Sequence, residues 1–328
     1  MKAAIVSAKG KTPVYGDFET PVAKDGLELI SVRAAALSNL TKSRASGAHY
    51  SSAGTFPAVA GTDGVGRTQD GRRVYFAMPE APFGSLAEVC PIHPRRCVEI
   101  PESLDDITAA AIANPGMSAW ASLVVRAHLV PGETVMVNGA TGTAGRIAVQ
   151  LAKHLGAGRI IATGRNVQEL EEVSQLGADV IVPFALGADH PSGASDYEEA
   201  LKQAFSEGVD VVMDYLWGES AHTTIIALAS TIEDRPARFV HVGTASGEPN
   251  IDLPGAALRS SALTLMGSGV GSVSQQALLE SIHSIFEAVQ PANLKIAFRA
   301  VPLAEVESVW EQAKGKPRVV FTIGPKTL

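Results

Sequence analysis

The chain has 328 residues, more than one compact domain usually holds, so two domains are expected. Hydrophobic residues make up 46% and charged residues 19% of the sequence, the composition of an ordinary globular protein with ample material for a core. The formal net charge of −7 gives no general attraction to nucleic acid or to an anionic membrane surface, so neither is an expected partner.

No apolar run reaches the ~20 residues that a membrane-spanning helix requires. Residues 1–11 are typical of a strand and not of a signal peptide, because their apolar run is short and no cleavage-like site follows. The two cysteines, Cys90 and Cys97, do not make a disulfide framework. A reducing, cytoplasmic location is therefore the default expectation.

The first part of the chain, to about residue 110, is rich in strands and turns and poor in helix. This pattern predicts a small, mostly antiparallel, barrel-like β-domain. The strand candidates are 2–7, 27–36, 65–68, 73–77 and 86–90, with a short helix at 39–46. From residue 105 the pattern changes to helix, and we predict helices at 107–113 and 117–128 on either side of the Asn-Pro-Gly sequence at 114–116.

Strands and helices alternate from residue 134 to about residue 269, which predicts a doubly wound parallel sheet, the Rossmann fold. The predicted strands are 134–138, 159–163, 180–183, 209–215, 238–242 and 263–267. The predicted helices between them are 144–155, 167–176, 197–205 and 220–229. The polar stretch 188–195 is expected to be a surface loop. Beyond residue 269, a helix (274–289), a strand (297–301), a helix (303–314) and a strand (318–323) are expected to return to the first domain.

A glycine-rich turn joins the first strand of this series to its helix. Ala140, Gly142 and Gly145 have the A-x-G-x-x-G spacing of a dinucleotide fingerprint whose first glycine is replaced by alanine. Gly142 lets a pyrophosphate approach the backbone, Gly145 lets the helix pack on the strand, and the helix offers free N–H groups. We predict that a dinucleotide binds here, with a structural turn as the alternative. The residues concerned are Ala140, Thr141, Gly142, Thr143, Ala144 and Gly145.

The end of the second strand indicates which dinucleotide binds. An NAD site needs an acidic residue at this place, whereas an NADP site needs a cation near the 2′-phosphate. The sequence reads Gly164, Arg165, Asn166, with no Asp or Glu at the strand end. Arg165 can offer a planar charged fork to the phosphate, and Asn166 can donate beside it. We therefore predict NADPH as the cofactor, the alternative being that Arg165 is a solvated loop charge.

Nearly the whole chain resembles the zinc-independent, quinone oxidoreductase-like (zeta-crystallin-like) medium-chain dehydrogenases/reductases. The resemblance rests, in chain order, on 29–37 leading into Asn39, the Phe-Pro at 56–57, the glycine motif at 61–66, Gly-Arg-Arg-Val at 71–74, Gly-Ser-Leu-Ala-Glu at 84–88, the turn at 140–145, 208–214 and 302–306. It implies a GroES-like catalytic domain formed by residues 1–115 and 270–328 and a Rossmann NADP-binding domain at 116–269. It also implies a cleft where the domains join, and a homodimer formed through edge strands around residues 263–266.

The same resemblance implies that three further strand ends line the nicotinamide half of the site. These are Tyr215 with Leu216 after the fourth strand, Gly243, Thr244 and Ala245 after the fifth, and Gly267, Ser268 and Gly269 after the sixth. All follow the carboxyl ends of strands, where ligands bind in open α/β sheets. The alternative is that they are ordinary turns.

No metal is expected. Zinc-dependent relatives carry a Cys after the second strand and a His-Glu pair in the following glycine motif, where this chain has Ser38-Asn39 and Gly61-Thr62-Asp63, and their lobe of four cysteines is missing. Cys90 and Cys97 have no Cys or His partner at the spacing of metal ligands. The nicotinamide must then supply the reducing chemistry, while the protein stabilises the acceptor oxygen that becomes negative.

The family places three candidate catalytic residues in the cleft: Asn39, Tyr50 and Ser118. Asn39 and Ser118 can each donate a hydrogen bond to a carbonyl or quinone oxygen, or can serve as helix caps, a position that Asn favours. Tyr50 resembles the proton-donating tyrosine of enoyl-thioester reductases, but the segment at 47–50 is one residue longer than theirs and Ser51 replaces the usual proline. The alternative role for Tyr50 is an aromatic wall.

The favoured function is an NADPH-dependent reductase that transfers a hydride to a small-molecule quinone or similar conjugated carbonyl without a metal. The alternatives are an enone or enoyl-thioester reductase with Tyr50 as proton donor, and a catalytically idle NADPH-binding module.

Overall fold

The structure is a computed structural model that describes residues 1–24, 26–48, 52, 54–232, 234–313 and 316–324. The chain folds as two compact units. The first comprises Met1–Asn114, Ile282–Val289 and Lys295–Leu328, and the second comprises Pro115–Ser281 and Gln290–Leu294. The α/β class predicted from the sequence is confirmed.

The first unit is built on two sheets, one of three strands in the order β2-β1-β4 and one whose main path is β15-β16-β3-β5-β6-β8, with β7 also paired to β3. All of its strand pairs are antiparallel except β15 with β16. The strands are β1 (Lys2–Val6), β2 (Val14–Asp17), β3 (Glu28–Ala36), β4 (Ala58–Val59), β5 (Asp63–Arg67), β6 (Arg73–Ala77), β7 (Val89–Ile92), β8 (Cys97–Glu99), β15 (Phe298–Pro302) and β16 (Arg318–Thr322). Short helices α1 (Asn39–Ala45) and α9 (Val306–Trp310) and the 3₁₀ turns η1 (Pro94–Arg96) and η3 (Leu303–Glu305) also belong to it.

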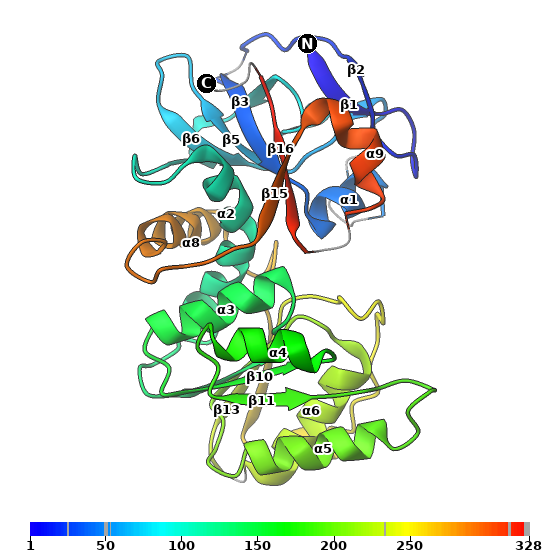
Figure 1. Ribbon diagram of the computed structural model, residues 1–328, viewed down its shortest axis with the longest axis vertical. Coiled ribbons are helices and arrows are strands. Elements are labelled where there is room, and N and C mark those ends of the chain that lie inside the picture. The colour runs from blue at the N-terminus through cyan, green and yellow to red at the C-terminus, as the bar shows by residue number, and fades with distance from the viewer. Residues whose placement is uncertain (25, 49–51, 53, 233, 314–315, 325–328) are drawn as a thin grey trace. The chain divides into compact units, whose positions relative to one another are not determined.

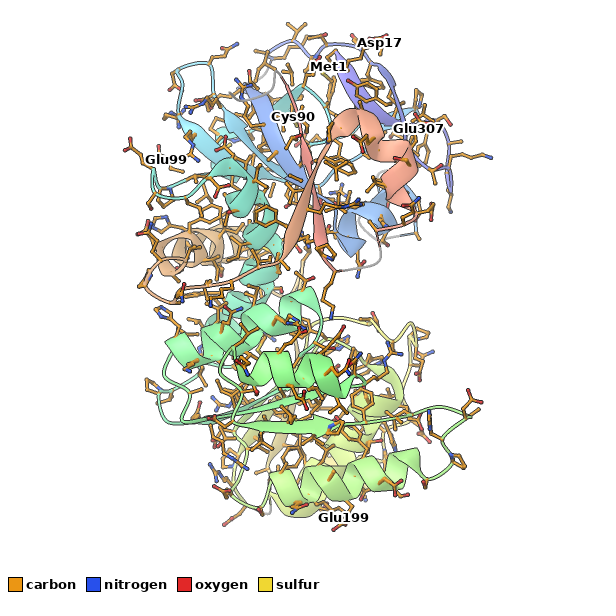
Figure 2. All side chains as sticks on the ribbon, in the orientation of Figure 1. Met1, Asp17, Cys90, Glu99, Glu199 and Glu307 are labelled. Atoms are coloured by element: carbon orange, nitrogen blue, oxygen red, sulfur yellow. The ribbon has the colours of Figure 1, made fainter. Side chains whose placement is uncertain are left out.

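Segments from both ends of the chain form this unit. β16 pairs with the central strand β3, with Val320 opposite Ala36. The backbone N–H of Tyr15 on β2 donates to Glu307 Oε1 on α9 at 3.1 Å, and Glu307 is labelled on this unit in Figure 2. Alternate β3 residues such as Ile30 and Val32 are buried against Phe321 of β16, so the last strand closes the core that the first strands begin.

The second unit holds a six-stranded parallel sheet in the order β11-β10-β9-β12-β13-β14. Its strands are β9 (Thr134–Asn138), β10 (Arg159–Gly164), β11 (Val180–Pro183), β12 (Val211–Asp214), β13 (Ala237–His241) and β14 (Leu263–Gly267). Figure 1 shows α3 (Thr143–His154) and α4 (Val167–Ser174) on one face, and α5 (Gly193–Ala204) and α6 (Gly218–Thr231) on the other. A short helix, α7 (Gly255–Arg259), precedes β14.

The strand order reverses between β9 and β12, which is the arrangement of the Rossmann fold. Every residue of β9 and β12 is buried, because helices cover both faces of a parallel sheet. In such a sheet the crevice at the carboxyl ends of the two strands beside the reversal is the place where ligands bind. The geometry of the second unit therefore directs attention to the turns that follow β9, β10, β12, β13 and β14.

The structure corrects the prediction of a helix break at Pro115. Helix α2 (Asp106–Trp120) runs through this proline and continues into a π-helical turn, η2 (Ala121–Arg126). A proline inside a helix removes one hydrogen bond, but residues 109–113 are almost wholly excluded from solvent, so tertiary packing outweighs the local cost. The Ser118 hydroxyl donates to the Pro115 carbonyl at 3.0 Å within the same helix.

Other differences from the predicted elements are small and local. Helix α5 begins at Gly193, inside the stretch 188–195 that was predicted to be loop, and the strand predicted at 86–90 lies at Val89–Ile92. Strands β2, β4 and β8 and helix α7 are absent from the prediction, because two to five residues are too few to show a periodicity. Helix α8 (Gln275–Ala288) matches its prediction closely. Among the described residues, no helix combines the length and apolar character needed to cross a membrane.

Candidate functional site

The glycine turn after β9 has the geometry of a phosphate cradle. Gly142 is the N-cap of α3 and makes no side-chain cap bond, so the amino end of this helix is not closed by a side chain at that position. A Cβ built on Gly142 would meet only the Gly139 carbonyl oxygen, at 3.5 Å, which leaves this side of the turn open. A Cβ on Gly145 would lie 2.7 Å from Ala140 Cα and closer still to the Gly139 oxygen. Gly145 therefore sets the close approach of α3 to β9, and Gly142 leaves room for a ligand.

The residue that makes the tight turn is Gly139, which the sequence prediction overlooked. Its φ is +86°, and a Cβ there would lie 2.9 Å from Leu216 Cγ. An L-residue with a side chain is strained at such a φ, so glycine is favoured on two counts. Gly139, Gly142 and Gly145 form a G-x-x-G-x-x-G series, the signal that would have found the residue. Ala140, placed first in the predicted fingerprint, is fully buried.

The end of β10 lies against this turn. Gly164 is buried, and a Cβ there would lie 2.8 Å from Thr141 Cγ2. Arg165 and Asn166 follow and are exposed, and the Asn166 Oδ1 atom accepts the Glu169 N–H at 3.1 Å as the cap of α4. Within the described part of the chain, Arg165 makes no ion pair or side-chain hydrogen bond. It lines a surface cavity of about 500 Å³ together with Phe184 and His190, so its guanidinium is available to an anion.

A buried polar network connects the carboxyl ends of four neighbouring strands, β10, β9, β12 and β13. The Asn138 amide accepts from the Thr163 hydroxyl at 2.8 Å and donates to Asp214 Oδ1 at 2.9 Å. The other carboxylate oxygen of Asp214 lies 3.0 Å from His241 Nδ1. Asp214 is fully buried, and the backbone N–H groups of residues 216 and 217 also donate to it. A buried carboxylate with this many donors is stabilised, so the network holds the four strand ends in register.

This network is not predicted by the sequence patterns. The available signal was a polar residue at the end of each buried apolar strand. Trp217, which follows Asp214, has φ +62°, unusual for a bulky residue, and its ring centroid lies 4.2 Å from that of His241. The backbone N–H of Trp217, shared between both carboxylate oxygens of Asp214, and the ring contact hold Trp217 in this conformation at the edge of the sheet.

Tyr215 and Ser118 lie next to each other in the second unit. Burial raises the pKa of the Tyr215 hydroxyl well above its ordinary value, and the neighbouring Ser118 hydroxyl partly offsets this. Because the Ser118 hydroxyl donates its one hydrogen to the Pro115 carbonyl, this hydrogen is engaged within α2.

The turns after β13 and β14 are tied to their neighbours by backbone bonds. The Ala245 N–H donates to the Tyr215 carbonyl at 3.0 Å, and the Ser268 N–H donates to the His241 carbonyl at 2.9 Å. Thr244 is exposed, and Gly243 lies close to the same Tyr215 carbonyl. Cβ atoms built on Gly267 and Gly269 would have nothing within 4 Å, so the backbone of the β14 turn borders open space. The Arg126 guanidinium donates to the Gly267 carbonyl at 2.8 Å.

The remaining candidates belong to the first unit. Asn39 is exposed and is the first residue of α1, but the cap is Ser38, whose Oγ accepts the Thr41 N–H at 3.0 Å, so the alternative of Asn39 as the cap is wrong. Tyr50 lies outside the described residues. Cys90, labelled in Figure 2, is buried, and burial raises its pKa, whereas that of Cys97 rises to about 12. Both thiols are therefore uncharged at neutral pH and poor nucleophiles.

Zinc does not fit the side chains of Ser38, Thr62 and Asp63, which stand where zinc-dependent relatives carry metal ligands. Ser38, Thr62 and Asp63 supply two hydroxyls and a carboxylate, and the two hydroxyls are joined through Thr41. A catalytic zinc site uses three thiolate, imidazole or carboxylate ligands. Across the residues that the structure describes, no group of three or more His, Cys, Asp or Glu side chains is arranged to hold a metal ion.

The comparisons with known proteins agree with this geometry. A family profile described as zinc-binding dehydrogenase matches residues 144–287. The chain is 27% identical to the "probable NADPH-dependent quinone reductase tdiC" of Emericella nidulans, over 98% of this chain and 99% of that protein. It is 31% identical to polyketide synthase GfsB of Streptomyces halstedii over 82% of this chain but only 5% of the synthase. A mycobacterial quinone oxidoreductase superposes with a TM-score of 0.81 at 21% identity, covering 98% and 99% of the two chains.

A Rossmann sheet with an open glycine cradle, joined in one chain to a GroES-like β-rich unit, defines a dinucleotide-fold protein of the dehydrogenase/reductase class. The chain is similar in sequence and in fold to the quinone oxidoreductase-like medium-chain dehydrogenases/reductases.

Proposed function

We propose that this protein is an oxidoreductase that uses NADPH to reduce a quinone or similar conjugated carbonyl by direct hydride transfer, without a metal. The observation that carries the proposal is the open cradle at Gly142 beside an uncommitted arginine, Arg165, at the end of the next strand. The similarity to a probable NADPH-dependent quinone reductase over nearly the full length of both chains supports the same cofactor and acceptor class.

The residues of the second unit can hold NADPH in a consistent order. The pyrophosphate would lie over the turn from Gly139 to Gly145, and the 2′-phosphate would pair with Arg165. The turns after β12, β13 and β14 would border the nicotinamide half, with open backbone at Gly267 and Gly269. Bound in this way, NADPH supplies the hydride. The protein excludes water, orients the acceptor and stabilises the oxygen that becomes negative.

A second candidate function is the reduction of an enone or enoyl thioester with Tyr50 as the proton donor. The match to a segment of a polyketide synthase over 82% of this chain favours it. The third, an idle NADPH-binding module, predicts cofactor binding without turnover. NADPH binding measured by fluorescence, together with turnover, separates this module from both reductases.

The experiment that tests the proposal is NADPH oxidation by the purified protein against para-quinones, ortho-quinones, enones and enoyl thioesters, with and without a chelator. Turnover of quinones that survives the chelator is the expected result. Turnover restricted to enones or thioesters would replace the proposal with the second candidate, and tight NADPH binding without turnover would replace it with the third.

We also propose a homodimer formed through β14. This strand is at the end of the six-stranded sheet and pairs only with β13 among the described strands. Leu265 and Met266 on it are only partly buried. Pairing with the same strand of a second copy would satisfy the free backbone edge and cover these side chains. Light scattering that gives the mass of a single chain would contradict this assembly.

A further inference from the structure

Four polar side chains of the first unit form a continuous buried chain of hydrogen bonds, here called the hydroxyl chain: Ser38, Thr41, Thr62 and Asp63. Ser38 Oγ lies 3.0 Å from Thr41 Oγ1, which lies 2.9 Å from Thr62 Oγ1. Thr62 Oγ1 donates to Asp63 Oδ1 at 2.7 Å. All four residues are less than 10% exposed, so water does not compete along the chain.

The direction of these bonds follows from counting hydrogens. A hydroxyl has one hydrogen to donate, and an ionised carboxylate has none. Because Thr62 gives its hydrogen to Asp63, it must accept from Thr41, and Thr41 must then accept from Ser38. All the hydroxyl hydrogens therefore point toward Asp63 while Asp63 is ionised. When Asp63 is protonated it donates to Thr62 instead, and a hydrogen of the hydroxyl chain becomes available to another acceptor.

The surroundings of Asp63 favour its neutral form. Burial raises the pKa of Asp63, while the hydrogen bond from Thr62 and the charge of Arg318 partly offset this. The Tyr75 hydroxyl and Arg318 are the other titratable groups that face it, and both are buried. Within the described residues, Asp63 Oδ2 and the Nε and Nη2 atoms of Arg318 have no hydrogen-bond partner, so the charges of these two buried side chains are incompletely compensated.

The hydroxyl chain borders a cavity of about 70 Å³ within the first unit. Thr41 and Thr62 belong to its lining, and Phe56 and Phe83 contribute apolar walls. Arg44, one turn after Thr41 on α1, adds a positive charge to the same lining. A cavity with apolar walls, the hydroxyl residues Thr41, Ser52, Thr55 and Thr62 and one cation suits the oxygen end of a conjugated carbonyl, since negative charge that develops there is stabilised by Arg44.

We propose that Thr62 donates a proton to the oxygen of the reduced acceptor in this cavity and that Asp63 stores that proton. This inference rests on the proposed function. After the hydride has moved to the acceptor, the bond from Thr62 oxygen to its hydrogen breaks and the acceptor O–H forms. The hydrogen of Asp63 passes to the Thr62 oxygen at the same time, which leaves a carboxylate that solvent reprotonates. Ser38 and Thr41 are positioning residues that hold Thr62 in line.

The variant that tests this is Thr62→Val, which has the same shape without the hydroxyl, with Thr62→Ser as the conservative partner. For Thr62→Val we expect kcat with quinones to fall about 10²-fold, the usual contribution of a general acid, while KM for NADPH is unchanged. Thr62→Ser should restore most of the rate. Thr12→Val is the matched control, because Thr12 is an exposed threonine of the first unit that does not line this cavity and should retain wild-type kcat.

A second measurement follows the hydroxyl chain without turnover. Infrared spectra of the full-length protein in H₂O and D₂O should show the carbonyl band of a protonated carboxylic acid that vanishes in Asp63→Asn and shifts in Thr62→Val. The wild-type rate should fall as pH rises and this band disappears. A Thr62→Val protein with unchanged kcat, or a wild-type protein without the band at any pH of activity, would overturn the proton store. Absence of wild-type turnover would contradict the proposed function instead, and the band would still test the hydroxyl chain.

Discussion

Under the proposed function, the preference for NADPH over NADH depends on one charged side chain, Arg165. Removing it should cost one charge-assisted pair with the 2′-phosphate, about 1.5–3 kcal/mol, which corresponds to a roughly 10- to 100-fold loss. We expect Arg165→Ala to lower kcat/KM for NADPH by this factor and to leave kcat/KM for NADH nearly unchanged. Steady-state kinetics with both cofactors checks this. Arg299→Ala, at an exposed arginine of the first unit, is the control, and equal losses with both cofactors would contradict the assignment.

The buried hydroxyl of Tyr197 should make the folded protein less stable at alkaline pH. Burial raises its pKa from 10.0 to about 12, while hydrogen bonds to Thr163 and Thr224 lower it in part. A group whose pKa is higher in the folded state stabilises that state below its unfolded pKa, and the contribution is lost as pH rises through the folded pKa. The free energy of unfolding should therefore fall between pH 10 and about 12, with a limiting slope of about 1.4 kcal/mol per pH unit from this residue.

Tyr197→Phe removes the titrating hydroxyl and should flatten that fall. Urea unfolding at a series of pH values measures it, and the other buried tyrosines contribute equally to both proteins. At neutral pH the variant should lose only about 1 kcal/mol, since its weak bond to Asn138 spans 3.4 Å. An identical pH dependence in the two proteins would show that Tyr197 ionises without cost.

At the scale of the element, Gly145 and Gly142 of the turn after β9 have different roles. Gly145→Ala places a Cβ against the Gly139 carbonyl and Ala140 Cα, so α3 must move away from β9. We expect a loss of about 1–3 kcal/mol of stability, together with weaker NADPH binding. Thermal or urea unfolding and cofactor fluorescence measure the two effects.

Gly142→Ala should behave in the opposite way. Its φ is −70° and its Cβ would have ordinary contacts, so stability should change by less than about 0.5 kcal/mol. The added methyl group would stand in the open side of the cradle, and NADPH affinity should fall. Equal loss of stability in the two variants would mean that the open side is not a ligand site.

The polar network of Thr163, Asn138, Asp214 and His241 belongs to the same scale. It joins four elements that lie far apart along the chain, and it sits behind the turns that the proposed cofactor borders. The short hydrogen bonds of this network and the burial of its side chains indicate a rigid platform, since a fully bonded buried network has one low-energy arrangement. The strained Trp217 is held by that platform and not by its own backbone preference.

For the whole molecule, the prediction concerns assembly. Met266→Lys places a charge on the edge strand β14, where a second copy would pair, and charges on edge strands oppose such pairing. We expect the mass by light scattering to fall from two chains to one while NADPH binding persists. Leu258→Lys, at an exposed leucine of α7, is the control and should leave the assembly intact. A dimer that survives Met266→Lys would place the interface elsewhere.

Much of the architecture could be predicted from the sequence because local patterns of apolar and turn residues specify the strands and helices. The strands Thr134–Asn138, Arg73–Ala77, Val180–Pro183 and Leu263–Gly267 have the predicted bounds, since short apolar runs flanked by turn residues specify a buried strand locally. Local patterns also predicted the alternation of strand and helix, the position of the glycine turn and that of Arg165 after the second strand. The resemblance to quinone oxidoreductase-like proteins followed from the order of these motifs.

The tertiary structure alone decided which distant side chains meet. Asn138 and Asp214 are 76 residues apart, and Thr41 and Thr62 are 21 residues apart, so no local sequence pattern predicts either contact. Helix α2 continues through Pro115 because burial outweighs the lost hydrogen bond, and Gly139 is needed because Leu216 fills the space beside it. Local periodicity determines elements, whereas contacts between elements depend on packing that forms only once the chain has folded.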